Sequence, residues 1–274
     1  MAKILKIGIV GCGAIGSSLA KAISRDFRGK AVLVGLFDMD VLKASCLSEL
    51  ISRKKKLAAS LLESLIKKSD LVIEAASGAA SWEIAQKTLE SGCNIMIMSV
   101  GGIVGRYPEL LKLSKKYNAK VYLPSGAISG IDALKASVMG EIKAVTLTTS
   151  KNPLSFKGVR YVQDKGINLG AIKKERVLFN GTAKDAVKYF PQNINVAAVL
   201  SLAGIGAART RVRIIANPAV SRNIHEIEII SGAGTVYTRT ENVLHPENPK
   251  TSYLAFLSAV ATLKQILEPV KIGT

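Results

Sequence analysis

The pattern of apolar and polar positions changes once along the chain, near residue 124. Before that point, short and nearly continuous apolar runs predict buried strands. These runs lie at 5–10, 31–37, 71–75, 94–98 and 120–123. The segments between them have helical character and lie at 17–23, 41–68, 81–89 and 108–116. Because strands that alternate with helices form parallel sheets covered on both faces, we expect an α/β domain with a doubly wound parallel sheet.

After residue 124 the pattern becomes that of half-exposed strands. Apolar and polar residues alternate in several segments, which lie at 144–149, 208–216, 225–230 and 234–240. Such alternation predicts antiparallel strands with one face on a core and one face in solvent. Two further segments, 183–189 and 195–202, predict helices. We therefore expect a second, α+β domain, whose exposed sheet face can serve in dimerisation.

The end of the chain predicts one more helix. After Pro249 the segment 251–267 has the apolar spacing of a long amphipathic helix, which we expect to pack against the first domain. The expected domains are thus 1–124, completed by a C-terminal helix assigned to 245–274, and 125–244.

A glycine-rich turn follows the first predicted strand. Residues 11–16 read G-C-G-A-I-G and open a helical stretch. In a dinucleotide-binding turn the first glycine permits the tight bend, the second lets a pyrophosphate approach the backbone, and the third lets helix and strand pack closely. The pyrophosphate then lies on free N–H groups at the start of the helix. We expect the binding residues of this Rossmann turn to be Gly11, Gly13, Ala14, Ile15 and Gly16.

An acidic residue ends the second predicted strand. Asp38 lies 22 residues after Gly16, where a carboxylate accepts hydrogen bonds from the adenosine ribose. The same charge repels a 2′-phosphate, and no Arg or Lys follows before Lys43. The sequence therefore favours NAD as the cofactor, with NADP possible.

Small residues follow three of the predicted strands. Ligands of doubly wound sheets bind beyond the carboxyl ends of the strands, so these segments leave room for a cofactor. They lie at 75–78, 99–102 and 125–130. In the first of them, Ala76 and Ser77 are candidate cofactor contacts. Ordinary turn chemistry is the alternative explanation for each of them.

Composition limits the class of protein. The chain has 274 residues, 48% of them hydrophobic, which is enough for two domains. Three scattered cysteines indicate a reducing cytoplasm and neither a disulfide framework nor a zinc site, and we expect no metal. We expect no signal peptide and no membrane span, because no apolar run approaches the required length.

The net charge of +18 is spread along the chain, with its densest run at 53–56, where we expect a loop or a helix end. A solvated basic surface explains this charge, and it would attract an anionic substrate. A nucleic-acid partner is disfavoured, because only 5% of residues are aromatic and no stacking motif or recognition helix is evident.

Two histidines are the candidates for acid–base chemistry, since the imidazole titrates nearest neutral pH. His225 lies at the start of an alternating strand, where it shares a face with Ile227 and Ile229. A catalytic and a structural histidine are both compatible with this position. His245 lies in a turn-rich segment between prolines, where we expect it to be exposed. Asn193 and Asn195 precede or begin a predicted helix, so either can cap it or contact a nicotinamide carboxamide.

Taken together, these stretches resemble the L-aspartate dehydrogenase family over nearly the whole chain. The resemblance is carried by G-C-G-A-I-G at 11–16, V-I-E-A-A-S at 72–77, S-G-A-I-S-G-I-D-A at 125–133, T-T-S-K-N-P at 148–153, F-P-Q-N-I-N-V-A-A at 190–198, N-I-H-E-I at 223–227 and E-N-P-K-T-S-Y-L-A at 247–255. The ordered series is far more specific than the glycine turn alone.

The resemblance implies a Rossmann domain joined to an α+β catalytic domain, usually in a homodimer. It implies that His225 is the catalytic residue and that Ser129 and Asn195 contact NAD. The family often has alanine or glycine at the position of Ser129, so a backbone contact is expected there. We expect Lys151 to bind a substrate carboxylate as a point charge, the alternative being a solvated lysine.

The implied reaction is the NAD(P)-dependent oxidation of L-aspartate to iminosuccinate and then to oxaloacetate and ammonia, with iminosuccinate feeding NAD biosynthesis through quinolinate. Two other dehydrogenase types share the two-domain plan, namely dihydrodipicolinate reductase and homoserine dehydrogenase. The first would need a motif such as H-H-x-x-K, which this chain lacks. A Rossmann protein that senses nucleotides or binds nucleic acid without catalysis is the alternative from another class.

Overall fold

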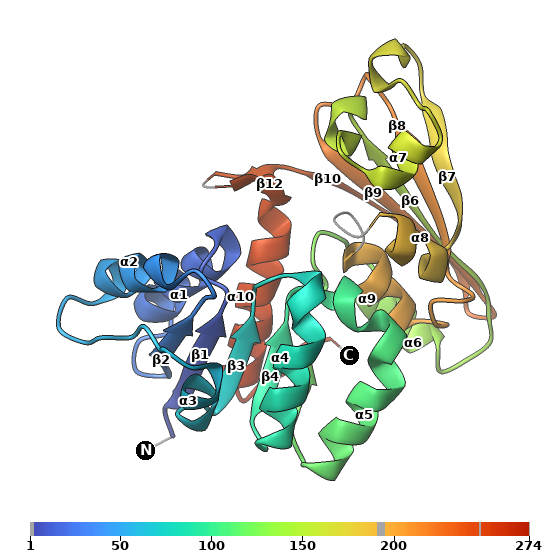
Figure 1. Ribbon diagram of the computed structural model, residues 1–274. Coiled ribbons are helices and arrows are strands. Elements are labelled where there is room, and N and C mark those ends of the chain that lie inside the picture. The colour runs from blue at the N-terminus through green and yellow to red at the C-terminus, as the bar shows by residue number, and fades with distance from the viewer. Residues whose placement is uncertain (1–2, 191–194, 247, 274) are drawn as a thin grey trace. The chain divides into compact units, whose positions relative to one another are not determined.

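The computed structural model describes residues 3–190, 195–246 and 248–273, which form two compact units. The first unit comprises Met1–Pro124 and Phe256–Lys271. The second comprises Ser125–Ala255 and Ile272–Thr274. Figure 1 shows the sheet of each unit, with the first in blue and teal and the second in green, yellow and orange. Among the described helices, none combines the length and the apolar character that a membrane crossing needs.

The first unit is built on a five-stranded sheet in which every described neighbour pair is parallel. The strands are β1 (Leu5–Val10), β2 (Ala31–Phe37), β3 (Leu71–Glu74), β4 (Asn94–Ile97) and β5 (Val121–Tyr122). Their order, β2-β1-β3-β4-β5, reverses between β1 and β3, and this is the switch point where doubly wound sheets bind ligands. The predicted α/β class of this domain is confirmed.

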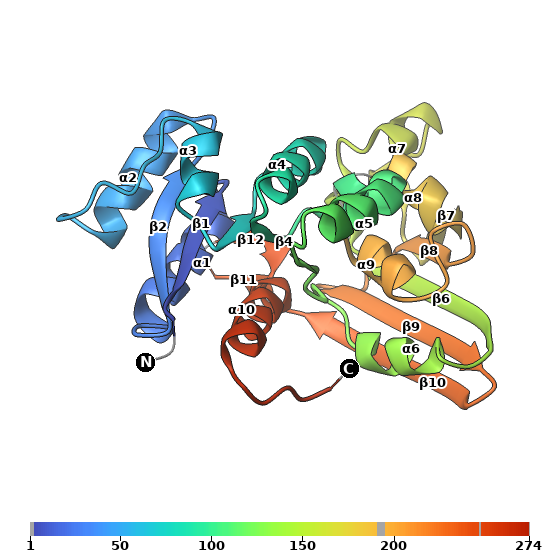
Figure 2. The same cartoon turned by 90° about the horizontal axis from the view of Figure 1, so that it is seen from below.

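Helices cover both faces of this sheet (Figure 2). They are α1 (Ala14–Asp26), α2 (Val41–Ile51), α3 (Leu62–Lys67), α4 (Gly78–Glu90), η1 (Val100–Arg106), α5 (Tyr107–Lys116) and α10 (Tyr253–Leu267). Leu19 of α1 and Ala259 of α10 share a core with Ile7 and Ile9 of β1, whereas Leu65 of α3 packs over glycines on the other face. The apolar side chains of β1 and β3 lie at the centre of this unit, since Ile7, Ile9, Leu71 and Ile73 are at most 1% exposed.

The predicted helix over 41–68 is wrong as one element. It is divided into α2 and α3, because the chain between them pairs its backbone with β2. Leu36 donates its N–H to the carbonyl of Leu57, and Ala59 donates to the carbonyl of Leu36, at 2.8 Å each. These bonds satisfy the outer edge of the sheet, which a continuous helix would leave open. The basic residues 53–56 lie exposed in this irregular segment, as expected.

The C-terminal helix is shorter than the expected 245–274. Residues before Tyr253 form a small hairpin of β11 (Leu244–His245) and β12 (Asn248–Ser252), consistent with the two prolines in this stretch, which disfavour a helix. His245 is buried and meets the Tyr253 ring edge-on at 5.4 Å, so its expected exposure is also wrong. A hairpin rather than a loop explains the difference.

The second unit has a mixed five-stranded sheet in the order β10-β9-β6-β8-β7. Its strands are β6 (Ile142–Lys151), β7 (Arg176–Thr182), β8 (Arg211–Ala216), β9 (Asn223–Ser231) and β10 (Gly234–Asn242). Only the β6–β8 pair is parallel among the pairings described. Strand β7 was not predicted, because its burial does not alternate and it contains an Asn-Gly pair.

One face of this second sheet is covered and the other is polar. The covering elements are α6 (Ile131–Ser137), η2 (Pro153–Phe156), α7 (Arg160–Asp164), η3 (Leu169–Ala171), α8 (Ala183–Tyr189) and α9 (Asn195–Ala203). Val145, Leu147, Ile227 and Ile229 point into the resulting core, in which Phe156 and Phe190 meet edge-to-face. This is the alternation that the sequence predicted for the strand containing His225.

Candidate functional site

The glycine turn of the first unit is shaped by close backbone approaches. Gly11 has a φ of +96°, and a Cβ added there would lie 2.4 Å from the Ala75 carbonyl oxygen. A Cβ on Gly16 would lie 1.8 Å from the Gly11 carbonyl oxygen, so only glycine fits at this third residue of α1. Nothing lies within 4 Å of the corresponding position at Gly13. Gly11 and Gly16 therefore serve the fold, whereas Gly13 leaves open space.

The start of α1 is suited to an anion. Gly13 is the N-cap residue, no side chain caps the helix, and no acidic residue lies in the first turn. The N–H groups of Ala14, Ile15 and Gly16 belong to this turn, whose amides have no intrahelical acceptors. Free amides and the positive end of the helix dipole together favour a phosphate at this position.

Asp38 lies just after the carboxyl end of β2 and braces the glycine turn. Its Oδ2 accepts the Cys12 N–H at 2.7 Å, and its Oδ1 accepts the Asp40 N–H at 2.9 Å. Each carboxylate oxygen has a second lone pair, so both contacts leave acceptor capacity for hydroxyl groups. Burial and the Asp38 charge raise the pKa of the Cys12 thiol to about 12, so this thiol stays protonated and unreactive.

A cavity of about 580 Å³ brings several predicted cofactor residues together. It is lined by Gly11, Gly13, Asp38, Ala76 and Ser77, among others. Its volume is within the range of small-molecule and cofactor sites. The open space at Gly13, the helix amides and the carboxylate are the features that a dinucleotide requires, so the residues present fit this group.

Glu74 holds two of the predicted small-residue segments, although the sequence pattern did not single it out. This glutamate ends β3, is fully buried, and accepts the Ala76 N–H at 2.8 Å and the Ser99 N–H at 3.0 Å. It thereby joins the two small-residue segments that follow β3 and β4. Burial raises the pKa of its carboxyl group, and the hydrogen bonds oppose that rise. A lone charged residue in the apolar run L-V-I-E was the available signal.

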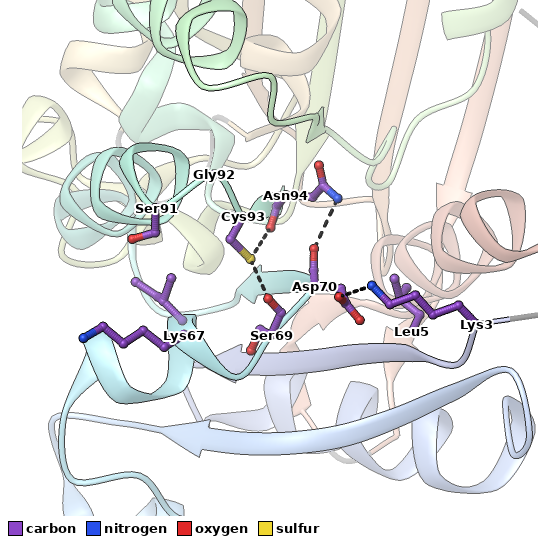
Figure 3. A pocket seen from close by; sticks show the side chains of 10 residues that line it. Lys3, Leu5, Lys67, Ser69, Asp70, Ser91, Gly92, Cys93 and Asn94 are labelled. Carbon is purple, nitrogen blue, oxygen red and sulfur yellow. Dashed lines mark hydrogen bonds and ion pairs between the residues drawn. The ribbon is translucent and has the colours of Figure 1, made fainter.

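A second cavity of the first unit, of about 520 Å³, lies at the amino ends of the strands (Figure 3). Leu5 and Asn94, which begin β1 and β4, line it together with Asp70 and Cys93. Lys3 pairs with Asp70 at 2.8 Å. Burial raises the pKa of the Cys93 thiol to about 11. Because doubly wound sheets bind ligands at the carboxyl ends of their strands, this cavity is not the cofactor crevice.

The second unit places His225 on the covered face of its sheet. His225 lies on β9, directly opposite Thr149 on β6, and the Thr149 Oγ1 is 2.9 Å from the His225 Nδ1. Lys151 follows two residues later on β6, so its side chain points to the same face. All three residues are at least nine-tenths buried. A cation and an imidazole thus share a site that is largely removed from water.

Burial changes how both of these nitrogen groups titrate. It lowers the pKa of His225 to about 3, with a further contribution from the positive charge of Lys151. Burial also lowers the pKa of Lys151 to about 8. The expected titration of His225 near neutrality is therefore not found in the ligand-free chain, because desolvation disfavours the charged ring. Lys151 is the group whose pKa lies near physiological pH.

The predicted segment 125–130 lies beside the same strands. The Ala127 carbonyl accepts hydrogen bonds from the Thr240 hydroxyl at 3.2 Å and the Asn242 amide at 3.0 Å. Thr240 pairs with His225 across β10 and β9, and its hydroxyl also lies 3.3 Å from the His225 carbonyl oxygen. Ser129 of this segment is exposed. The segment is therefore anchored at the edge of the strand pair that carries His225.

Asn195 is the first residue of α9 and is exposed, whereas Asn193 lies outside the described residues. The predicted cofactor residues are thus divided between the units. Asn195 and Ser129 lie in the second unit with His225 and Lys151, and the others lie in the first.

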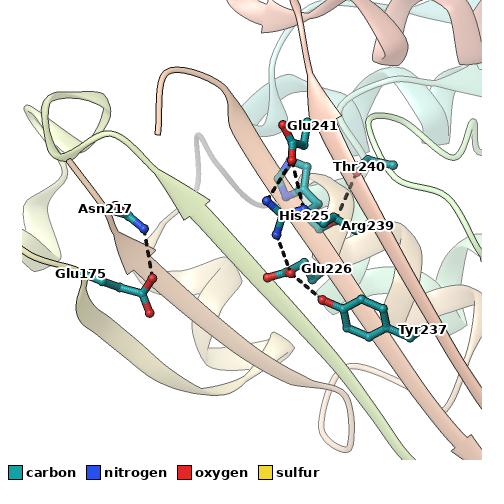
Figure 4. Close-up of polar contacts among 8 residues, drawn as sticks. All are labelled: Glu175, Asn217, His225, Glu226, Tyr237, Arg239, Thr240 and Glu241. Atoms are coloured by element: carbon teal, nitrogen blue, oxygen red, sulfur yellow. Dashed lines mark hydrogen bonds and ion pairs between the residues drawn. The ribbon is translucent and has the colours of Figure 1, made fainter. Parts of the chain in front are cut away.

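The face of the second sheet opposite His225 carries a separate polar network (Figure 4). Glu226 accepts hydrogen bonds from the Arg239 guanidinium at 2.7 Å and from the Tyr237 hydroxyl. Arg239 also pairs with Glu241 at 2.9 Å. Because side chains alternate along a strand, these groups point to the face of the sheet opposite His225. They therefore belong to the solvent side and not to the buried site.

Comparison with known proteins places a boundary at the same residue, 124, although the second match extends into α10 of the first unit. Residues 11–124 match a family described as "Homoserine dehydrogenase, NAD binding domain", and residues 132–266 match "Aspartate dehydrogenase, C-terminal". The chain is 48% identical over 273 residues to L-aspartate dehydrogenase of Methanosarcina mazei, covering 99% of this chain and all of that protein. It is 42% identical, with the same coverage, to L-aspartate dehydrogenase of Methanococcus maripaludis.

Solved structures extend the comparison. The crystal structure of aspartate dehydrogenase from Thermotoga maritima is similar with a TM-score of 0.75 and 26% identity, over 99% of this chain and 100% of that one. A homoserine dehydrogenase from Thiobacillus denitrificans is similar in fold, with a TM-score of 0.62 and 14% identity, over 97% of this chain and 73% of that one.

Two glycine substitutions should separate fold from cofactor binding. We expect Gly16→Ala to lower the free energy of unfolding by about 1–3 kcal/mol or more, because its Cβ would meet backbone. Gly13→Ala should change it by less than about 1 kcal/mol, since the position is open. The Gly13→Ala methyl group should nevertheless weaken NADH binding by at least about tenfold, because the pyrophosphate must approach this backbone.

Thermal unfolding and titration of NADH fluorescence measure the two effects. Gly140→Ala, at an unhindered position in the second unit, is the control for both. Unchanged NADH affinity in Gly13→Ala would contradict the placement of the pyrophosphate.

Proposed function

Because the chain belongs to the L-aspartate dehydrogenase family, we propose that it oxidises L-aspartate to iminosuccinate, which water converts to oxaloacetate and ammonia. One observation carries the proposal. The stretch that matches the aspartate dehydrogenase C-terminal family, 132–266, contains the buried imidazole and ammonium groups of His225 and Lys151. A cationic, water-poor site of this kind suits a dicarboxylate substrate that exchanges protons.

The pyrophosphate and the adenosine ribose of the cofactor are proposed to bind residues of the first unit. The amides of Ala14, Ile15 and Gly16 would hold the pyrophosphate next to Gly11 and Gly13, and Asp38 would accept the ribose hydroxyls. Bound NAD supplies the nicotinamide carbon that accepts the hydride from the substrate Cα.

Further contacts would hold the coenzyme beyond its pyrophosphate. Ala76 and Ser77 line the cavity next to the turn, and Glu74 fixes the Ala76 amide. Ser129, through its backbone, and Asn195 are proposed to contact the nicotinamide end. Orientation of this end is the main contribution of the protein, because the hydride chemistry belongs to the cofactor.

Lys151 is proposed to bind one substrate carboxylate. Its burial leaves the ammonium poorly solvated, so an anion replaces part of the lost hydration. The carboxylates also bring negative charge close to His225, which raises the pKa of its imidazole from the low value of the free protein. His225 would then exchange protons with the substrate nitrogen and the attacking water, which is typically worth about 10²–10⁴-fold in rate.

We further propose that NAD is preferred over NADP, because the Asp38 carboxylate lies where a 2′-phosphate would be repelled. The iminosuccinate that the enzyme releases would serve as a precursor of quinolinate in NAD biosynthesis.

We propose a homodimer, with the polar outer face of the second sheet as the surface available to a second copy. Cys12, Cys46 and Cys93 are all free thiols, which supports activity in a reducing compartment such as the cytoplasm.

A homoserine dehydrogenase activity is the second candidate, because the first domain matches the cofactor domain of that family. The likeness to the homoserine dehydrogenase structure supports the fold alone. Homoserine has one carboxylate and no charged side chain, so a site with a buried lysine beside a histidine favours aspartate.

An assay of NADH formation with a panel of amino acids tests this function. L-aspartate should exceed glutamate, alanine and homoserine in kcat/KM. His225→Ala should lower kcat by at least about 10²-fold while NADH affinity stays within about twofold. Glu226→Gln, next in sequence but on the solvent face, is the matched control and should keep its turnover. Comparable turnover of homoserine, or full activity of His225→Ala, would refute the assignment.

Cofactor preference depends on the Asp38 charge. Asp38→Ala should weaken NAD binding and reduce the preference for NAD over NADP by about tenfold, which corresponds to about 1.4 kcal/mol. Asp38→Asn keeps an oxygen for the Cys12 N–H, so it isolates the loss of charge from the loss of the brace. Asp40→Asn, which retains an acceptor for the Leu42 N–H, should leave the preference unchanged. Cofactor titrations with both coenzymes decide the point.

The Lys151 charge should govern how dicarboxylate binding depends on pH. Its pKa of about 8 means that the amine is protonated below pH 8 and neutral above it. Succinate has no group that titrates in this range, so its affinity should fall about tenfold per pH unit above pH 8. Lys151→Met should bind weakly and without this dependence, whereas Lys143→Met, exposed on the same strand, should match the unaltered protein.

Competition of succinate with L-aspartate between pH 6.5 and 9.5 measures this dependence. A flat profile in the unaltered protein would show that the charge on Lys151 does not bind the carboxylate.

A further inference from the structure

We propose that Thr149 is a positioning residue that holds the His225 imidazole in the tautomer protonated on Nε2, so that the ring meets the substrate as a hydrogen-bond donor. The identity of the substrate rests on the proposed function, but the tautomer does not.

The pairing of β6 with β9 fixes the two side chains against each other. Thr149 and His225 are directly opposite residues of the antiparallel ladder, and the Thr149 Oγ1 lies 2.9 Å from the His225 Nδ1. Thr149 is 4% exposed and His225 is 5% exposed, so water does not compete freely for this hydrogen bond. Thr149 is β-branched, and its hydroxyl therefore has few rotamers open to it within a strand.

The number of protons on the ring follows from its surroundings. Burial and the positive charge of Lys151 on the same face both disfavour an imidazolium ion. A neutral imidazole carries one proton, either on Nδ1 or on Nε2. The choice between these nitrogens therefore depends on which way the hydrogen bond with Thr149 runs.

The hydroxyl group of Thr149 decides that direction. Within the described part of the chain, the only hydrogen bond of this hydroxyl is the one to His225. If Nδ1 carried the proton, the Thr149 hydroxyl oxygen would accept a hydrogen bond from it. The proton of the Thr149 hydroxyl would then be buried without an acceptor. If Thr149 donates instead, its proton is satisfied and the ring proton must be on Nε2. An unsatisfied buried donor is strongly disfavoured, so the second arrangement prevails.

A second threonine holds the other side of the same strand. The Thr240 hydroxyl lies 3.3 Å from the His225 carbonyl oxygen and 3.2 Å from the Ala127 carbonyl oxygen, so it contacts the backbone and not the ring. In the described residues the ring makes no hydrogen bond through Nε2. Thr149 thus fills Nδ1, and Nε2 is the nitrogen left to a ligand.

The consequence concerns the role of His225 in the reaction. A neutral ring whose Nδ1 is already an acceptor cannot take a proton from the substrate before it has given one away. It begins as a donor to a substrate oxygen or nitrogen through Nε2, as neutral imidazoles do where a carbonyl must be polarised. Thr149 has no contact with the substrate in this scheme and acts through the ring.

Nitrogen NMR tests the tautomer directly, because the chain has only two histidines. With ¹⁵N-labelled histidine, long-range ¹H–¹⁵N correlations distinguish a protonated ring nitrogen from an unprotonated one, and His225→Gln assigns the signals. We expect an unprotonated Nδ1 and a protonated Nε2 for His225 from pH 6 to pH 8. A protonated Nδ1, alone or in a charged ring, would overturn the inference.

Substitutions at Thr149 supply the second readout. Thr149→Val removes the hydroxyl group at nearly constant shape, so His225 should show mixed tautomers and kcat should fall by at least about tenfold with unchanged NADH affinity. Thr149→Ser restores the hydroxyl donor, so it should recover most of the single tautomer of His225 and most of kcat. Thr148→Val, the same change on the opposite face of β6, is the matched control.

The two proposals can fail separately. A correct tautomer in a protein without aspartate oxidation would refute only the function. Aspartate oxidation with a protonated Nδ1, or with full turnover in Thr149→Val, would refute only the role of Thr149. If Thr149→Val does not fold, the spectrum of the unaltered protein still decides.

Discussion

The antiparallel register between β6 and β9 is the constraint on which the candidate active site depends. It places Thr149 opposite His225 and directs Lys151 to the same buried face. Since side chains alternate along a strand, a slip by one residue would exchange this set for Thr148, Ser150 and the solvent-facing residues. The apolar residues Ile227 and Ile229 resist such a slip, because they would lose their core contacts. The geometry of this candidate site is therefore stabilised by the packing of the second unit.

The first unit positions its ligand through missing side chains and not through added ones. Gly11 and Gly16 allow backbone segments to approach closely, and this brings the start of α1 next to the ends of β1 and β3. Asp38 and Glu74 then use carboxylate oxygens to hold the neighbouring amides in place. The sequence predicts a ligand-binding role for Asp38 and no role for Glu74. Both side chains thus also act as braces for the cofactor turn.

The local pattern of apolar and polar residues predicts those features that depend only on residues close in sequence. The bounds of β1 and β2, and the face that His225 shares with Ile227, follow from periodicity alone. Non-local pairing was invisible to that reasoning. The break between α2 and α3 arises from backbone bonds to Leu36, and β7 lacks alternation. The low pKa of His225 and the contact with Thr149 depend on burial by several elements, which no sequence window contains.

The three thiols of the chain differ in a way that offers a practical handle. Those of Cys12 and Cys93 are buried and resist ionisation, whereas Cys46 lies exposed on α2. Electrophilic reagents attack thiolates that solvent can reach. A maleimide dye should therefore attach at one position, Cys46 on α2. The natural chain already carries a single addressable anchor for fluorescence or spin-label spectroscopy.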